Sequence, residues 1–280
     1  MSEVISTQGL SLGYGLDLTP PATGFVHSVF HTAVNGIVNG EMWTFLAEPK
    51  RDLPFGIRMA RRGFEGLTIR RGDAIHVRAG YIAIDSIEAR FVIDCRSAKQ
   101  WTPFYAPAFT PGTSRRLETV LSLARERAWR GAFDLARVVS ANLRDPVMLS
   151  RALAKTIGTG PGATPSGDDV LIGILAVLAS PYSGETGSLC LRTLAKGISP
   201  LLANTTDVSA HLLQQAMRGF VSRDLSELLV VLASDPSSPS LQLALNRIVE
   251  TGATSGADCC IGLATAAPSF FISQSERAAA

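Results

Sequence analysis

Three aspartates stand where carboxylate chemistry is feasible. Asp168 and Asp169 close a stretch from 158 to 169 that contains four glycines and two prolines, and Asp258 follows a similar stretch that begins at Gly252. Glycine adopts backbone angles closed to other residues, and proline lacks an N–H donor, so both stretches are predicted to be loops. Carboxylates at the end of a loop can accept hydrogen bonds from a ligand, hold a cation or cap a helix. All three are candidate catalytic residues.

The first loop leads into a helix that must be buried. Residues 170–179 are apolar on every side, which is typical of a core helix. The start of a helix carries unpaired N–H groups that favour an anion, so we expect free N–H groups and an anion site where this loop meets the helix. The residues expected to bind substrate or phosphate there are Gly160, Gly162, Thr164, Ser166 and Gly167.

The chain repeats this motif about ninety residues later. Apart from the inserted Pro165, both copies read Gly-Ala-Thr-Ser-Gly-x-Asp-x-x-Ile-Gly, at 162–173 and at 252–262. A glycine one turn after each aspartate lets a second backbone approach closely. We therefore predict that helices 167–179 and 256–267 touch near Gly173 and Gly262, which brings the two loops together. The second copy adds three candidate binding residues, Thr254, Ser255 and Gly256.

A third polar stretch precedes a later helix. Thr205, Thr206 and Ser209 lie in Asn-Thr-Thr-Asp-Val-Ser, and Ser209 leans towards the apolar face of the helix that follows. We count these three residues as candidate ligand-binding residues. The alternative is that Thr206 or Asp207 is simply the N-cap of that helix.

The charges of this expected site conflict, because two helix N-termini favour an anion and three carboxylates repel one. Asp169 and Asp258 could act as capping carboxylates, three residues after Ser166 and Ser255, which would leave Asp168 as the functional residue. A divalent metal such as magnesium could instead bridge carboxylate and phosphate. Or the aspartates could accept hydrogen bonds from an amide or carbamoyl NH2 while the loops hold its phosphate or carboxylate end. We favour the third arrangement with some capping, and expect no dedicated metal site.

Composition limits the classes of function. The 280 residues are 46% hydrophobic and carry a net charge of +2, so nucleic acid is not an expected partner. No run of 18 apolar residues indicates a membrane span, and the N-terminus has no signal-peptide pattern. The four cysteines form no Cys-x-x-Cys pair, which favours reduced thiols. A cytoplasmic protein that binds small molecules is expected.

The two halves of the chain differ in pattern. Short alternating segments between 25 and 93, with Asn39-Gly40 as a hairpin turn, predict a small antiparallel sandwich or barrel. Residues 1 to about 20 are polar and Gly-rich and are expected to lie at the surface. A proline-rich connector spans 101–113, and helical patterns follow. The fold class is therefore α+β, with a β-rich domain over 1–105 and an all-helical domain over 113–280 that contains a buried pair of repeat-related helices.

Taken together, the three motifs resemble those of the AllH-type family, whose best-known members are a subunit of oxamate carbamoyltransferase in allantoin breakdown. The resemblance implies exchange of a carbamoyl group between carbamoyl phosphate and oxamate or a related amide, in purine nitrogen catabolism. It also implies two other transferase subunits as partners. The chain departs from the family pattern at Ala163, often Leu, and at Ala253, often His. Because of the second change, a general-base role at that position does not carry over from the family.

Three functions compete on this basis. The first is a subunit of a carbamoyl- or acyltransferase that works by direct transfer, since no His or Cys is placed to form an acyl-enzyme. The second is a non-catalytic ligand-binding or regulatory subunit. The third is a phosphotransferase, which is disfavoured because no Gly-Lys-Ser/Thr follows the glycines.

Overall fold

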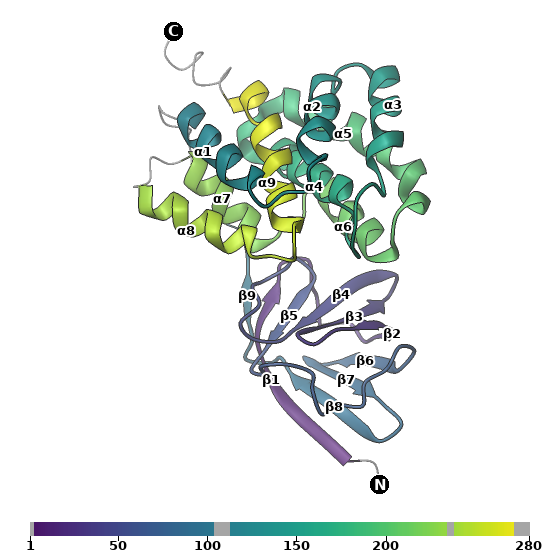
Figure 1. Ribbon diagram of the computed structural model, residues 1–280. Helices are drawn as coiled ribbons and strands as arrows, with labels where there is room; N and C mark the ends of the chain where they lie inside the picture. Colours follow the sequence, from purple (N-terminus) through teal and green to yellow (C-terminus); the bar gives the residue numbers. More distant parts are fainter. Residues whose placement is uncertain (1–2, 104–112, 234–237, 272–280) are drawn as a thin grey trace. The chain divides into compact units, whose positions relative to one another are not determined.

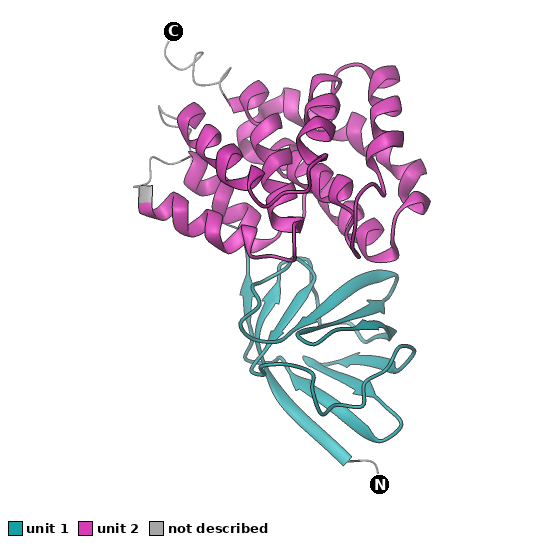
Figure 2. Ribbon diagram, viewed as in Figure 1, with its two compact units in different colours: residues 1–103 teal, residues 104–280 magenta. Residues whose placement is uncertain are grey.

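The computed structural model describes residues 3–103, 113–233 and 238–271. The chain divides into two compact units, residues 1–103 and 104–280, drawn in teal and magenta in Figure 2. Most of the predicted connector at 101–113 lies outside the described residues. The division into domains at 1–105 and 113–280 stays a proposal.

The first unit is a closed β-sheet. Its strands follow the order β5-β4-β3-β2-β6-β7-β8-β1, and a pairing between β1 and β5 closes the circle into a barrel of eight strands. A ninth strand, β9, adds to β1 (Figure 1). The strands are β1 (Glu3–Gly13), β2 (Ala22–Val29), β3 (Ala33–Val38), β4 (Glu41–Leu46), β5 (Gly56–Met59), β6 (Ala74–Arg78), β7 (Tyr81–Asp85), β8 (Ala89–Asp94) and β9 (Lys99–Trp101).

The expectation of a purely antiparallel β domain is wrong. β1 pairs in parallel with β8 and β9, and β4 pairs in parallel with β5. Most of the N-terminal stretch expected at the surface forms strand β1, whose first half is largely exposed and whose second half contains buried residues. The predicted hairpin turn is confirmed, with Asn39 at φ 50° and Gly40 at φ 81° between β3 and β4.

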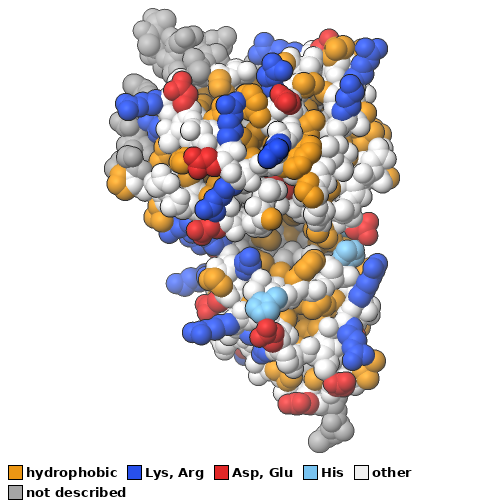
Figure 3. Space-filling view, in the orientation of Figure 1, with side chains coloured by type: hydrophobic (Ala, Val, Ile, Leu, Met, Phe, Trp, Pro, Cys, Tyr) orange, Lys and Arg blue, Asp and Glu red, His pale blue; other side chains and the backbone are white. Residues whose placement is uncertain are grey.

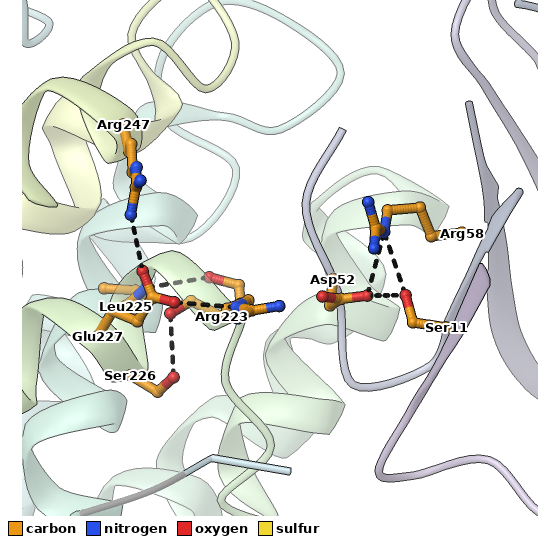
Figure 4. Close-up of polar contacts among 9 residues, drawn as sticks. Ser11, Asp52, Arg58, Arg223, Leu225, Ser226, Glu227 and Arg247 are labelled. Carbon is orange, nitrogen blue, oxygen red and sulfur yellow. Dashed lines mark hydrogen bonds and ion pairs between the residues drawn. The ribbon is translucent and has the colours of Figure 1, made fainter. Parts of the chain in front are cut away.

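A buried polar cluster joins strands of the barrel (Figure 4). Asp52 accepts a hydrogen bond from the hydroxyl of Ser11 on β1. The Arg58 Nε on β5 donates to that hydroxyl at 3.1 Å and lies 3.6 Å from the Asp52 carboxylate. Because Asp52 is almost fully buried, these partners offset the cost of removing its charge from water.

The second unit is helical throughout the residues that the structure describes. The elements are α1 (Thr113–Arg125), α2 (Ala132–Ala141), α3 (Pro146–Thr156), α4 (Ser166–Ala179), η1 (Pro181–Ser183), α5 (Gly184–Ile198), η2 (Ser199–Asn204), α6 (Asp207–Met217), α7 (Arg223–Ala233), α8 (Ser238–Val249) and α9 (Ser255–Ala266). Glu227 on α7 accepts from Arg223 at 2.9 Å and from Arg247 of α8 at 3.4 Å, which links the two helices (Figure 4).

The predicted pairing of the repeat helices is confirmed. A Cβ atom added at Gly173 of α4 would lie 2.0 Å from the carbonyl oxygen of Cys259, and one at Gly262 of α9 would lie 2.0 Å from that of Val170. The two backbones therefore touch at reciprocal positions, as glycine alone allows. Both helices lie in the core of the helical unit (Figure 1).

The surface carries no concentrated charge of one sign on the face shown in Figure 3, where Lys and Arg side chains are scattered among acidic and apolar ones. No single helix in the described ranges is long and apolar enough to cross a membrane. Residues 166–179 and 181–204, bent by 67° at their junction, pass that test only as a pair, on length and composition.

Candidate functional site

The two repeat copies meet at the starts of α4 and α9. Thr164 Oγ1 from the first loop and Ser255 Oγ from the second lie 2.8 Å apart. Each copy also faces an aspartate of the other, because Asp169 interacts with the Ser255 hydroxyl and Asp258 with the Ser166 hydroxyl. The internal repeat thus builds one reciprocal cluster rather than two separate ends.

The glycine loop has an unusual backbone. Gly158, Gly160 and Gly162 have φ of +72°, +109° and +97°, whereas Thr159 and Pro161 between them do not have positive φ. Alternation of positive and negative φ is the backbone pattern of the N–H concavities that bind anions. The N–H groups of Gly160, Gly162 and Ala163 donate no hydrogen bond to the described part of the chain.

The N–H groups at the start of α4 are not free as expected. Gly167 N donates to Thr159 O at 2.8 Å, and the N–H groups of Asp168 and Asp169 donate to Pro165 O at 2.9 and 3.2 Å. These three N–H groups are therefore not available to an anion.

The two loop-end glycines face protein backbone. A Cβ atom at Gly167 would lie 1.9 Å from Thr156 O, and one at Gly256 would lie 1.6 Å from Ile248 O. Their lack of a side chain serves packing inside the helical unit. A larger residue at Gly167 would thus disturb the fold, so it cannot test ligand approach by itself.

Asp168 is fully paired. Its Oδ1 accepts from Gly158 N at 2.9 Å, and its Oδ2 accepts from the hydroxyls of Thr205 and Ser209, the latter at 2.7 Å. These bonds tie the glycine loop, α4 and the start of α6 together. Asp168, which the sequence suggested as the functional residue, therefore has a clear structural task.

Thr206 is the N-cap of α6, as the alternative interpretation proposed. Its Oγ1 accepts from Ser209 N at 3.1 Å. The same hydroxyl donates to Ala163 O at 2.6 Å, so the cap also fastens the glycine loop.

The expected capping by Asp169 and Asp258 is wrong. The N-cap positions of α4 and α9 are Pro165 and Thr254, and neither makes a side-chain cap bond. Both carboxyls instead turn into the cluster and are almost fully buried. Burial and the charges of Asp258 and Asp168 raise the pKa of Asp169 to about 8, against the opposing hydrogen bonds of Ser255 and Thr164.

Asp258 is held differently. Burial raises the pKa of Asp258, and the hydroxyls of Ser166 and Thr254 and the Trp129 N–H oppose that rise. The Trp129 N–H donates to its Oδ1 at 2.8 Å. Because this contact comes from a backbone group far away in the sequence, no residue pattern could have revealed it.

Two buried carboxyl oxygens of the cluster lack a hydrogen-bond partner among the described residues, Asp169 Oδ2 and Asp258 Oδ2. Buried polar atoms are normally paired, so unpaired ones at one place indicate a position for a ligand. No group of three His, Cys, Asp or Glu side chains in the described ranges could hold a metal ion. The unpaired oxygens suit a ligand that forms hydrogen bonds with carboxyl groups.

The predicted residues divide into two sets by position. Those at the junction of the repeat copies are Thr164, Ser166, Asp169, Thr254, Ser255 and Asp258. Those that support or border it through Asp168 or the glycine loop are Gly160, Gly162, Thr205, Thr206 and Ser209.

Together these features describe a two-unit α+β protein whose helical unit carries a buried, hydroxyl-lined carboxylate pair built by an internal repeat. Residues 156–267 match the family described as oxamate carbamoyltransferase subunit AllH, and residues 11–100 match the AllH family N-terminal domain. The chain therefore belongs to the AllH family. Among solved structures, none matches this chain.

Proposed function

We propose that this chain is a subunit of a carbamoyltransferase that exchanges a carbamoyl group between carbamoyl phosphate and oxamate or a related amide. The family description supports a subunit role in such an enzyme. The proposal includes two other transferase subunits as partners, a cytoplasmic location and a place in the catabolism of allantoin nitrogen.

The observation that carries the proposal is the group of unpaired buried acceptors between the two repeat copies. A carbamoyl group and its amide nitrogen both donate and accept hydrogen bonds, and Asp169 Oδ2 and Asp258 Oδ2 lack partners. The phosphate end of the same ligand suits the unpaired N–H groups of Gly160, Gly162 and Ala163. These N–H groups would hold phosphate oxygens, and a phosphate hydroxyl would face Asp258.

Binding of this kind requires the glycine loop to move. Asp169 and Asp258 are 3% and 0% exposed, so a substrate cannot touch them while the loop is fastened. The glycine loop is held by the hydrogen bond between the Thr164 and Ser255 hydroxyls and by the one from the Thr206 hydroxyl to Ala163 O. We propose that substrate replaces them, which positions the carbamoyl group in a site closed to water.

The test is carbamoyl phosphate formation by the complete enzyme, reconstituted from this chain and its partner subunits, with phosphate and carbamoylated oxamate as substrates. Ser255→Ala removes a hydroxyl of the cluster and is expected to lower kcat/KM by about tenfold, the equivalent of one hydrogen bond. Thr119→Val, which changes an exposed hydroxyl on α1, is the control. Equal kcat/KM for both variants and wild type would contradict a substrate role for the cluster.

The alternative is a non-catalytic ligand-binding or regulatory subunit. It predicts that calorimetry detects carbamoyl phosphate on this chain while Ser255→Ala changes only the ligand concentration at which the complex responds. A bridging magnesium ion is a separate alternative, and it predicts that a chelator abolishes phosphate binding to the isolated chain.

A further inference from the structure

We infer that Asp169 and Asp258 together hold one proton, that Asp169 carries it in the resting site, and that the pair moves the proton of carbamoyl exchange. This inference rests on the proposed function and assigns to it two separate roles. Asp169 is the proton donor to the nitrogen of the departing amide, and Asp258 is the proton acceptor from phosphate.

The reciprocal packing explains why only one of the two carboxyls is charged. Asp169 is 3% exposed and Asp258 is 0% exposed, and they occupy equivalent places in the two repeat copies. Ionisation of both buried carboxyls is unfavourable because their negative charges repel each other, so the pair retains one proton. The titratable side chains that face Asp169 are Asp168, Asp258 and the buried thiol of Cys259. None of these is a cation that could balance a second negative charge.

The repeat is not perfectly symmetrical, and the difference decides where the proton lies. Asp258 Oδ1 accepts from the backbone N–H of Trp129 at 2.8 Å. A backbone N–H can only donate, so it favours a negative charge on Asp258. Asp169 interacts with the hydroxyls of Ser255 and Thr164, which can rotate either to donate or to accept. Asp169 is therefore the member that keeps the proton, and burial raises its pKa to about 8.

The unpaired oxygens have the right character for these roles. Asp169 Oδ2 and Asp258 Oδ2 each lack a partner within the described chain. A proton on Asp169 has no acceptor until a ligand supplies one, and Asp258 has a free lone pair for an incoming donor. A fully satisfied structural network would pair both oxygens, so these two atoms are open to a ligand.

The proton balance of the exchange fits one donor and one acceptor. When hydrogenphosphate attacks carbamoylated oxamate, a C–O bond to phosphate forms and the C–N bond to oxamate breaks. The phosphate hydroxyl passes its proton to Asp258, and Asp169 passes its proton to the nitrogen, which leaves as neutral amide. The pair ends with the proton on Asp258, and it returns to Asp169 through solvent when the glycine loop opens. No further reactant is needed, and the reverse reaction uses the opposite assignment.

The first part of the test locates the proton without any assay of activity. Infrared spectra of the isolated chain at neutral pH are compared for wild type, Asp169→Asn, Asp258→Asn and the exposed control Asp134→Asn. We expect a carbonyl band of a protonated carboxylic acid in wild type that Asp169→Asn alone removes. Absence of the band, or its survival in Asp169→Asn, would overturn the inference even if the complex is an active transferase.

The second part measures transfer in the reconstituted complex. An Asn side chain resembles the neutral carboxyl in shape, so Asp169→Asn is expected to bind carbamoyl phosphate with a Kd within about threefold of wild type while kcat falls by about 100-fold or more. Asp258→Asn is expected to lower kcat similarly, and Asp134→Asn to leave it unchanged. Unchanged kcat in Asp169→Asn would refute proton donation. A wild-type complex that exchanges no carbamoyl group would refute the proposed function itself, whatever the infrared spectra show.

Discussion

Replacement of Asp169 by Asn should raise the stability of the protein at alkaline pH, because Asn carries no charge where wild type must bury an ionised carboxylate. In the folded chain, burial raises the pKa of this carboxyl from 3.8 to about 8. Between these two values the folded state binds the proton more tightly than the unfolded state does. The free energy of unfolding therefore falls as pH rises through this window and levels off above it.

The size of the effect follows from the shift in pKa. One pKa unit corresponds to about 1.4 kcal/mol, so the full shift sets an upper limit of about 6 kcal/mol on the penalty that ionised Asp169 imposes at high pH. Asn has no charge to bury and is nearly the same shape. The gain in stability of Asp169→Asn over wild type should therefore be small near about pH 4 and grow to several kcal/mol by about pH 8.

The assay is urea denaturation of wild type and Asp169→Asn at a series of pH values, because the difference between the two curves cancels groups that titrate in both proteins. Asp134→Asn, at an exposed position of α2, measures the effect of the substitution itself. A difference between Asp169→Asn and wild type that stays constant from acid to alkaline pH would refute the assignment of a raised pKa to this buried carboxyl.

Three further predictions concern stability and are checked by thermal or urea denaturation. Gly173→Ala places a methyl group 2.0 Å from the carbonyl oxygen of Cys259 and should lower the free energy of unfolding by about 3 kcal/mol or more. Gly197→Ala in α5 is the control, because its methyl group meets only a flexible side chain. Equal effects of the two substitutions would contradict the close helix pairing. Asp168→Asn loses a carboxylate that accepts three hydrogen bonds and should lower the free energy of unfolding by about 2–4 kcal/mol. An unchanged melting temperature would show that these bonds do not stabilise the fold. Asp145→Ala removes the N-cap of α3, which accepts from two backbone N–H groups, and should cost about 1 kcal/mol; no loss would argue against the cap.

The β unit illustrates where local patterns fail. The hairpin at Asn39-Gly40 was predictable because a two-residue turn with positive φ requires such residues. β1 was not, since its partners β8 and β5 lie far away in the sequence. Parallel pairing of β1 with β8 depends on closure of the whole sheet, which leaves no short-range signature.

The aspartates show the same limit within the candidate site. Their spacing from Ser166 and Ser255 matched a capping box, and on that basis Asp168 was the residue left for function. In the structure both carboxylate oxygens of Asp168 accept hydrogen bonds from the glycine loop and from α6. The unpaired oxygens belong instead to Asp169 and Asp258, the two residues expected to cap helices. Which oxygen is paired depends on backbone groups such as Trp129 N that tertiary packing brings in.

The sequence by itself determined the α+β composition, the helical second half and the contact of α4 with α9. The contact of α4 with α9 could be predicted because the motif occurs twice in the chain. A glycine at the same place in each copy allows a close approach of the two backbones. Tertiary structure alone decided which carboxyls are buried without partners. Hydrogen-bond satisfaction in a core is a property of all the neighbours of an atom, and those neighbours come from loops and helices that the sequence keeps far apart.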